Sequence, residues 1–445
     1  MSSIHKDPTN LKALLARASQ QIPRGLSPAE IFSDPAIFDQ EMASIFAKTW
    51  VFVAFESEIP DAGDFVTRSI GKDPVLVTRS RNGDINVMAN FCRHRGAQLC
   101  SAEQGNALNF RCPYHGWVYK NNGSWRGAPD KTLYYSTIDK DAWGLLRAPN
   151  VSSIHGLIFA CLDQDAPPLL EYLSGAAWML KTILDLHPAG MTVMGPPDRY
   201  RVRGNWKTAS ENFAGDTYHL NVAHRSVQTI ELAAGFEFIN ETTVTYIAGN
   251  GHCFTGSNAA TSALWGYGDT LRREFDLDRF DDVQREMLSQ NPPTVGNIFP
   301  NLGFIRVGDM PTDGREPSIY TSFRQFQPIS AHETEIVSWQ LKWNFEDAAG
   351  AEAAYSMGQY SFGSAGIFEQ DDAVLWEGAP KVGDSKWAQN AGTLFNMQLG
   401  MDHLGGADLR DTQWRGPGER YRGGVSEAAA RSFYSRWLAD MTQTG

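Results

Sequence analysis

The chain reads Cys92-Arg93-His94 and, after seventeen intervening residues, Cys112-Pro113-Tyr114-His115. Each segment offers one thiolate and one imidazole at close spacing. Two loops of this kind can hold a [2Fe–2S] cluster, with both cysteines on one iron and both histidines on the other. A zinc site is the alternative, but zinc fingers usually pair Cys with Cys and His with His along the chain. The mixed order therefore predicts the iron–sulfur cluster.

The residues around these ligands favour the same interpretation. Gly96 and Gly116 give each loop a permissive backbone, so that amides can approach the sulfides of a cluster. The segment through Gly116-Trp117 resembles the Rieske domain of ring-hydroxylating oxygenases. Rieske proteins of respiratory complexes carry an additional Cys in each loop and join the two in a disulfide. This chain has Ala97 and Tyr114 at the matching positions, so that disulfide is not available to it.

Length and composition describe a globular protein without a nucleic-acid or membrane partner. The 445 residues are enough for two domains, each with its own core. Lys+Arg 39 against Asp+Glu 51 gives a net charge of −12, which argues against binding a phosphate backbone. The longest apolar runs are too short to span a bilayer, and the first twenty residues lack the apolar core of a signal peptide. We therefore expect a cytoplasmic location.

Three regions are expected along the chain. Residues 1–49 contain two helical patterns, and we expect these helices to pack on a catalytic domain. Residues 50–165 contain short alternating runs separated by Gly, Asp and Asn, which predict an all-β unit. This unit includes every candidate cluster ligand and is the expected Rieske [2Fe–2S] domain. Residues 166–445, beginning near Pro167-Pro168, are the expected mononuclear-iron catalytic domain.

The third region mixes helical and strand patterns. This mixture predicts an α+β domain in which helices flank a large antiparallel sheet, in a helix-grip-like arrangement. The predicted fold is therefore an all-β Rieske domain inserted into an α+β catalytic domain. The predicted helices of the whole chain lie near 10–22, 34–49, 170–185, 206–224, 275–290 and 425–441, and the predicted strands of the third region near 243–248, 298–306, 318–326 and 334–343.

A second metal site is indicated by His219 and His224. Five residues separate these histidines by about 140° on an ideal helix, so both can face one metal only if the helix loosens between them. We expect it to loosen at Asn221. Two imidazoles and one carboxylate on one face of an iron form the facial triad, which leaves positions open for O2 and substrate. The third ligand is expected from the neighbouring pair Asp371 and Asp372.

Two stretches here resemble the aromatic-ring dioxygenase α subunits, particularly the naphthalene-dioxygenase-like branch. Asn205-Trp206-Lys207, Glu211-Asn212-Phe213, Asp216, His219 and His224 resemble the family's mononuclear-iron motif, and Phe362-Gly363 with Ala365 through Asp372 resembles its third-ligand segment. The resemblance covers nearly the whole chain. It implies that Asp372 is the iron-binding member of the pair, and that Asp216 and Asn212 are catalytic residues.

The resemblance also implies how the two centres work together. The family usually forms a trimer of α subunits, α3, often with small β subunits as α3β3, in which the cluster of one α subunit lies against the iron of its neighbour. Asp216 would then bridge the outer nitrogens of His115 on one subunit and His219 on the next, orienting both rings. A ferredoxin or reductase would deliver electrons from NADH, which this chain itself would not bind. O2 would add to the aromatic substrate as a cis-dihydrodiol.

The expected substrate is a neutral mono- or polycyclic aromatic hydrocarbon. A carboxylated substrate would need a buried cation, and we expect Arg225 and Arg306 to be exposed or structural instead. Family position makes Asn212 and a mostly apolar set the candidates to line the pocket. The substrate-binding candidates are Phe213, Leu220, Val295, Ile305, Phe362 and Phe368.

Three alternatives stay open. The same metals support monooxygenation, such as salicylate-type hydroxylation or O-demethylation. A pure Rieske electron-transfer protein needs about two irons per chain, where the oxygenase needs about three. A zinc-stabilised binding module would have no visible colour.

Overall fold

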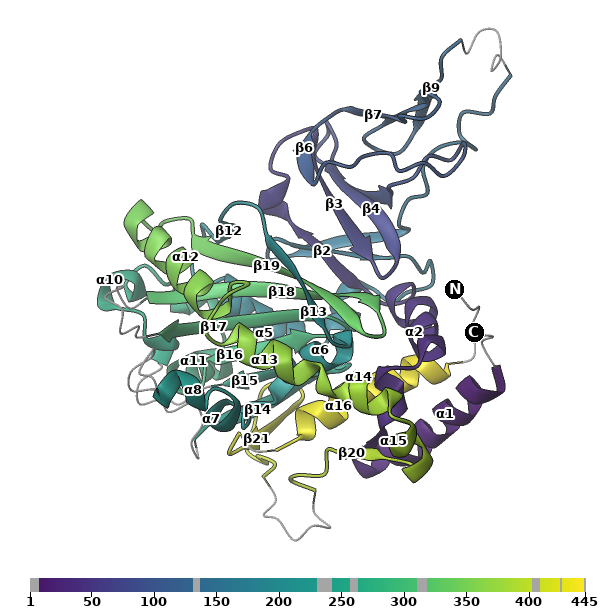
Figure 1. Cartoon of the computed structure of the whole chain (residues 1–445). Helices are drawn as coiled ribbons and strands as arrows, with labels where there is room; N and C mark the ends of the chain where they lie inside the picture. The colour runs from purple at the N-terminus through teal and green to yellow at the C-terminus, as the bar shows by residue number, and fades with distance from the viewer. Residues whose placement is uncertain are drawn as a thin grey trace. The chain divides into compact units, whose positions relative to one another are not determined.

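The chain divides into two compact units in the computed structural model (Figure 1). One unit is Phe46–Leu169, and the other joins Met1–Ile45 to Leu170–Gly445. The first contains antiparallel strands and the second contains helices around an antiparallel sheet, which confirms the predicted fold class. The structure describes residues 8–130, 137–229, 242–256, 263–309, 318–401, 409–424 and 426–443.

The smaller unit contains three antiparallel sheets, of order β5-β4-β3-β6, β10-β11-β2 and β7-β8-β9. Its core gathers Trp117, Tyr119 and Trp125 around the buried thiols of Cys92 and Cys112. Tyr119 is the buried middle residue of β8, and Trp125 is a buried residue of β9. The strands are β2 (Val51–Phe55), β3 (Asp64–Ile70), β4 (Asp73–Arg79), β5 (Ile85–Ala89), β6 (Gln104–Asn106), β7 (Asn109–Arg111), β8 (Val118–Lys120), β9 (Trp125–Gly127), β10 (Asn150–Ile154) and β11 (Leu157–Cys161).

The larger unit is built on a nine-stranded sheet of order β12-β19-β18-β17-β16-β15-β14-β21, with β13 also paired to β19. The single strand predicted over 298–306 is wrong. Two strands meet there, because Pro300 has no N–H for the ladder and the chain turns between Ile298 and Leu302. The strands are β12 (Met191–Val193), β13 (Asp198–Arg203), β14 (Val244–Gly249), β15 (His252–Gly256), β16 (Pro293–Ile298), β17 (Leu302–Asp309), β18 (Ser318–Ser330), β19 (Glu333–Trp343) and β21 (Glu419–Arg422), while β1 (Leu26–Pro28) and β20 (Leu394–Asn396) form a separate pair.

Helices α6 (Trp206–Gly215) and α12 (Ala348–Phe362) pack on the central strands of this sheet. The helix predicted over 275–290 begins only at Asp282, because the side chain of Asp281 caps it by accepting the Gln284 N–H. None of the described helices has the length and apolar character needed to cross a membrane. The other helices are α1 (Pro8–Gln21), α2 (Pro35–Glu41), α4 (Leu169–Leu173), α5 (Gly175–Leu184), α7 (Leu220–Ala223), α8 (Arg225–Thr229), α10 (Asp269–Arg272), α11 (Asp282–Gln290), α13 (Glu369–Trp376), α14 (Gly378–Asp384), α15 (Lys386–Ala391) and α16 (Ala428–Thr442).

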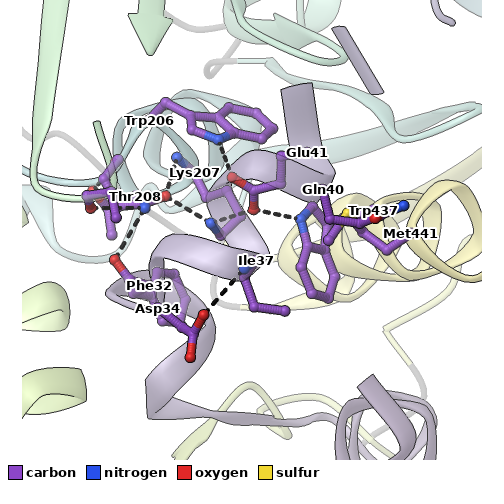
Figure 2. Close-up of polar contacts among 12 residues, drawn as sticks. Phe32, Asp34, Ile37, Gln40, Glu41, Trp206, Lys207, Thr208, Trp437 and Met441 are labelled. Atoms are coloured by element: carbon purple, nitrogen blue, oxygen red, sulfur yellow. Dashed lines mark hydrogen bonds and ion pairs between the residues drawn. The ribbon is translucent and has the colours of Figure 1, made fainter. Parts of the chain in front are cut away.

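A buried polar cluster connects α6 to α2, near the N-terminus, and to α16, near the C-terminus. Figure 2 shows Glu41 of α2 between Lys207 of α6 and Trp437 of α16. The Glu41 carboxylate accepts hydrogen bonds from Lys207 Nζ at 2.6 Å and from the indoles of Trp206 and Trp437, both at 2.8 Å. Glu41 and Lys207 are fully buried, so each charge depends on the other for compensation. This cluster holds the start of the helix that leads into the second metal site.

Candidate metal centres

The two cluster-ligand loops have the same backbone hydrogen-bond pattern. The amide of Gly96 donates to the carbonyl of Cys92 at 2.8 Å, and the amide of Gly116 donates to the carbonyl of Cys112 at 3.1 Å. Gly96 and Gly116 have φ values of 72° and 71°, in the left-handed region that favours glycine. Each loop therefore closes on its own cysteine through local bonds.

The side chains of the two loops converge. Cys92 and Cys112 are each 2% exposed, and the rings of His94 and His115 meet edge-to-face with centroids 4.6 Å apart. Trp117 stacks on His94 at 5.0 Å. Within the described residues, the buried Nδ1 of His94 has no hydrogen-bond partner, as expected of a nitrogen that binds a metal. Two thiols and two imidazoles in this arrangement fit a [2Fe–2S] cluster.

Tyr119 is a cluster neighbour that the sequence analysis missed. Its phenol oxygen accepts the amide of Arg93 at 3.1 Å and lies 3.4 Å from Cys92 Sγ. Burial, followed by the contact with Cys92, raises the pKa of Tyr119, so the phenol stays protonated and can donate toward the sulfur. In the sequence, the aromatic residues Trp117 and Tyr119 are two positions apart, and this alternation could have indicated that Tyr119 is buried beside the loops.

The helix predicted to carry the first histidine ends before reaching it. α6 stops at Gly215, and Asp216 leaves the helical region with φ −80° and ψ 66°. Asn221 lies inside the short helix α7, so the prediction that the chain loosens there is wrong. The backbone of Asp216 leaves the helical region instead, and the amide of Leu220 then bonds the carbonyl of Thr217 rather than that of Asp216.

The break allows both imidazoles to face one carboxylate. Asp372 Oδ1 lies 3.3 Å from His219 Nε2 and 3.4 Å from His224 Nε2. All three ligand atoms lie within 4.8 Å of one another, so small side-chain movements would let one metal ion bind all three. His224 is fully buried and Asp372 is 3% exposed. Within the described chain, His219 Nε2 and Asp372 Oδ1 are buried and have no well-formed hydrogen bond.

The electrostatics of this site favour a bound cation. Burial alone lowers the pKa of His219, but the carboxylates of Asp216 and Asp372 outweigh it and raise the pKa to about 10. For Asp372, burial raises the pKa, but the two imidazoles lower it further than burial raises it. The site therefore attracts positive charge, and a metal ion would displace the proton of His219.

The neighbouring aspartates Asp371 and Asp372 point to different sides of the imidazoles. Asp371 Oδ2 lies 3.4 Å from the outer nitrogen of His224 and accepts the Ser226 hydroxyl at 3.1 Å. On the other ring, Asp216 Oδ2 lies 3.4 Å from His219 Nδ1. Each histidine thus has one carboxylate beside its outer nitrogen, the arrangement that orients metal ligands. The sequence analysis missed this role of Asp371.

Asp216 also faces a cavity of about 190 Å³. Glu211, Tyr218 and Glu427 line the same cavity. Burial and the charges of Asp216 and Glu427 raise the pKa of Glu211. Asn212 lies one turn before Asp216 and accepts its amide with a main-chain carbonyl at 3.2 Å, while no side-chain hydrogen bond of Asn212 occurs in the described structure.

Most of the predicted pocket residues gather beside the three candidate ligands. Phe368 meets the ring of His224 edge-to-face at 5.2 Å and stacks on Phe362 at 5.5 Å. Leu220 is half-buried on α7 and lies outside this apolar cluster. The cluster also contains residues that the sequence analysis did not name, because strands and helices distant in sequence supply them. Predicted members are Phe213, Ile305, Phe362 and Phe368, with Val295 packed against them, and unpredicted members include Val227, Tyr320, Phe326 and Met357.

Neither arginine weighed in the sequence analysis faces this cluster. Arg225 is exposed. Arg306 points to the opposite side of β17 from Ile305, where it packs between the rings of Trp265 and Trp343. Among the residues that the structure describes, Arg324 does lie beside the cluster, where it is fully buried and ion-paired.

Two family models match the chain. The Rieske [2Fe-2S] domain matches residues 49–136, and the catalytic domain of the ring hydroxylating alpha subunit matches residues 191–443. The chain belongs to the α subunits of ring-hydroxylating oxygenases. It therefore carries a Rieske [2Fe–2S] cluster and a mononuclear iron, and it receives electrons through partner proteins. The match over the catalytic domain argues against a pure electron carrier.

The similar proteins include dioxygenases and a demethylase. The α subunit of N,N-dimethyl phenylurea N-demethylase from Sphingobium sp. (strain YBL2) is 40% identical, over 98% of this chain and 95% of that protein. The large oxygenase component of naphthalene 1,2-dioxygenase from Pseudomonas putida is 32% identical, over 93% and 91%. The crystal structure of naphthalene 1,2-dioxygenase from Rhodococcus sp. bound to indole superposes with a TM-score of 0.89 at 34% identity, covering 97% of this chain and 98% of that one. These findings confirm the resemblance seen in the sequence.

Proposed function

We propose that this chain is the terminal oxygenase of a multicomponent system that uses O2 to cis-dihydroxylate a neutral aromatic compound. One observation carries the proposal: the ligand atoms of His219, His224 and Asp372 meet beside buried aromatic side chains. In this assignment His219, His224 and Asp372 hold the mononuclear iron. The cluster ligands are Cys92, His94, Cys112 and His115. When bound, the two groups supply O2 activation and single-electron transfer.

The chain's own residues position the substrate and exclude water. Phe213, Phe362 and Phe368 present apolar rings beside His224, which suits an aromatic ring and excludes water from its surroundings. The charge of Arg324 is balanced by Glu369, so this arginine is not a free cation for a carboxylated substrate. A neutral aromatic compound is the chemistry that these side chains fit.

Electron transfer is proposed to occur between two copies of the chain. In each copy His115 is exposed, and Tyr114 beside it is 61% exposed. On the catalytic unit, Asp216 stands between His219 and an open cavity. The His115 ring of a second copy, entering that cavity, would meet the Asp216 carboxylate, which would then orient both imidazoles. A ferredoxin or reductase would supply electrons from NADH, and small β subunits would complete an α3β3 assembly, with α3 as the alternative.

A second candidate reaction is oxidative N-demethylation. The observation that favours it is the 40% identity with the phenylurea N-demethylase α subunit, against 32% with the naphthalene dioxygenase. The same apolar wall could hold the phenyl ring of such a substrate with its N-methyl group toward the iron ligands. Monooxygenation of this kind inserts one oxygen atom, and the hydroxylated methyl group then leaves as formaldehyde.

Labelled O2 separates these reactions. The purified chain, supplied with a ferredoxin, a reductase and NADH, would be given naphthalene, biphenyl and N,N-dimethyl phenylurea under ¹⁸O2. We expect a cis-diol with two labelled atoms from an aromatic hydrocarbon. If the phenylurea yields formaldehyde and no substrate yields a diol, N-demethylation replaces cis-dihydroxylation as the proposed reaction. The iron-deficient variant Asp372→Ala serves as the control, and parent protein that oxidises none of the substrates would reject both.

A further inference from the structure

A fully buried arginine joins three elements of the catalytic unit. Arg324 lies on β18, on the same face as Tyr320 and Phe326 of the apolar cluster. Its guanidinium forms an ion pair with Glu369 at 2.6 Å and a hydrogen bond with the phenol of Tyr200. Glu369 is the first residue of α13, and Tyr200 belongs to β13. One charge thereby connects β18, β13 and α13.

The same guanidinium contacts two aromatic residues of the apolar cluster. It lies 5.3 Å from the ring of Phe213 on α6 and 5.4 Å from the ring of Phe362 at the end of α12. α6 leads into Asp216 and His219, and α12 leads into α13. Arg324 therefore contacts α6, α12 and α13, three of the helices that surround the candidate iron ligands.

Glu369 is coupled to Asp372 through the geometry of α13. Residues three apart lie on the same face of a helix, so Glu369 and Asp372 point toward the same side. Both are buried, with exposures of 1% and 3%. Two carboxylates buried side by side repel each other, and the guanidinium of Arg324 cancels one of the two charges. Replacing such a pair with apolar residues is often neutral for stability, so stability alone does not account for this pair.

We infer that Arg324, Glu369 and Tyr200 are positioning residues that set the rotation of α13, so that Asp372 and not Asp371 faces the iron. This inference rests on the proposed ligands His219, His224 and Asp372. Successive helical residues point about 100° apart, so a modest rotation of α13 would move Asp372 away from both imidazoles. The ion pair at the first residue of α13 opposes that rotation.

The test is retention of mononuclear iron in Glu369→Gln, which keeps the side-chain size and removes the charge. We expect a ferrous chelator to remove half of this iron at a chelator concentration about 10- to 100-fold lower than the parent requires. Losing a residue that supports a metal ligand usually weakens metal binding by this factor. The EPR spectrum of the ferrous site treated with nitric oxide should also change. Tyr200→Phe should shift both measurements in the same direction by less.

A matched control comes from the other unit. Arg68 and Glu58 form a similarly buried ion pair, with side chains 3% and 4% exposed. Glu58→Gln should lower thermal stability to a similar extent while leaving chelator sensitivity and the nitric oxide spectrum of the iron at parent values. If Glu369→Gln does not fold, Tyr200→Phe decides the question alone.

The outcomes separate this inference from the ligand assignment. Parent-like iron retention and EPR in folded Glu369→Gln, or in Tyr200→Phe if the first variant does not fold, would overturn the positioning role. Asp372→Ala, measured alongside, tests the ligands themselves. Full iron retention in Asp372→Ala would reject the proposed ligand set, whereas iron loss there with none in Glu369→Gln would reject the positioning role only.

Discussion

The cluster loops and the iron site are assembled in different ways. Each cluster loop closes on itself, with a glycine amide four residues on bonded to the cysteine carbonyl. The iron site instead joins α6 and α7 to α13, and His224 and its outer carboxylate Asp371 are 147 positions apart. The first centre depends on local backbone geometry, whereas the second depends on how helices pack on a sheet. The two centres should therefore respond to different mutations.

The largest effect is expected from Asp372→Ala. This change removes the carboxylate that faces both imidazoles, so mononuclear iron and turnover should both be lost. The cluster lies in the other unit, so its visible absorbance should stay. Iron analysis should fall from about three to about two per chain, with acid-labile sulfide unchanged. Loss of the cluster colour would show that the two centres are not independent.

His115→Ala is the reciprocal change. It removes an imidazole from the convergent set of two thiols and two histidines, so the cluster should bleach and its Rieske EPR signal should disappear. The mononuclear iron should remain, because its three proposed ligands belong to the other unit. An unchanged Rieske signal would exclude His115 as a ligand.

A smaller effect should separate the two outer carboxylates. Asp216→Asn and Asp371→Asn make the same chemical change beside the outer nitrogens of His219 and His224. Asp371→Asn should cost about 10-fold in turnover, through the orientation of one ligand. Asp216→Asn should cost about 100-fold or more with both metals bound, because it also interrupts the proposed contact with a second copy. Equal losses of turnover would remove Asp216 as a bridge.

The smallest effects are expected in the cluster loops. Gly96→Ala places a side chain in the left-handed region, at a cost of about 1–2 kcal/mol, with open space around the added atom. Gly116→Ala has the same strain, and its Cβ would also lie 2.8 Å from Pro129 Cγ. Cluster loss on heating should therefore occur at a lower temperature for Gly116→Ala. The reverse order would show that strain within the loop does not govern cluster stability.

Residue type and spacing were sufficient to propose the cluster centre. The order of cysteine and histidine predicted Cys92, His94, Cys112 and His115 as ligands, and the structure brings the two loops together, because each loop is a local structure. The fold class also followed from the change of periodicity after residue 165, since alternating and helical patterns are local properties of a chain. The break in the helix could be anticipated from the five-residue spacing of His219 and His224, but it was placed at Asn221 when it begins at Asp216.

Tertiary packing decided the rest. Spacing made Asp371 and Asp372 equal candidates, and only the family resemblance pointed to Asp372. In the structure the choice depends on how α13 meets β13 and β18, where Glu369 pairs with Arg324. Phe213 and Phe362 likewise became neighbours only because α6 and α12 pack on the same sheet. Contacts between segments more than a hundred residues apart leave no periodic signal in the sequence, because they depend on the packing of whole elements.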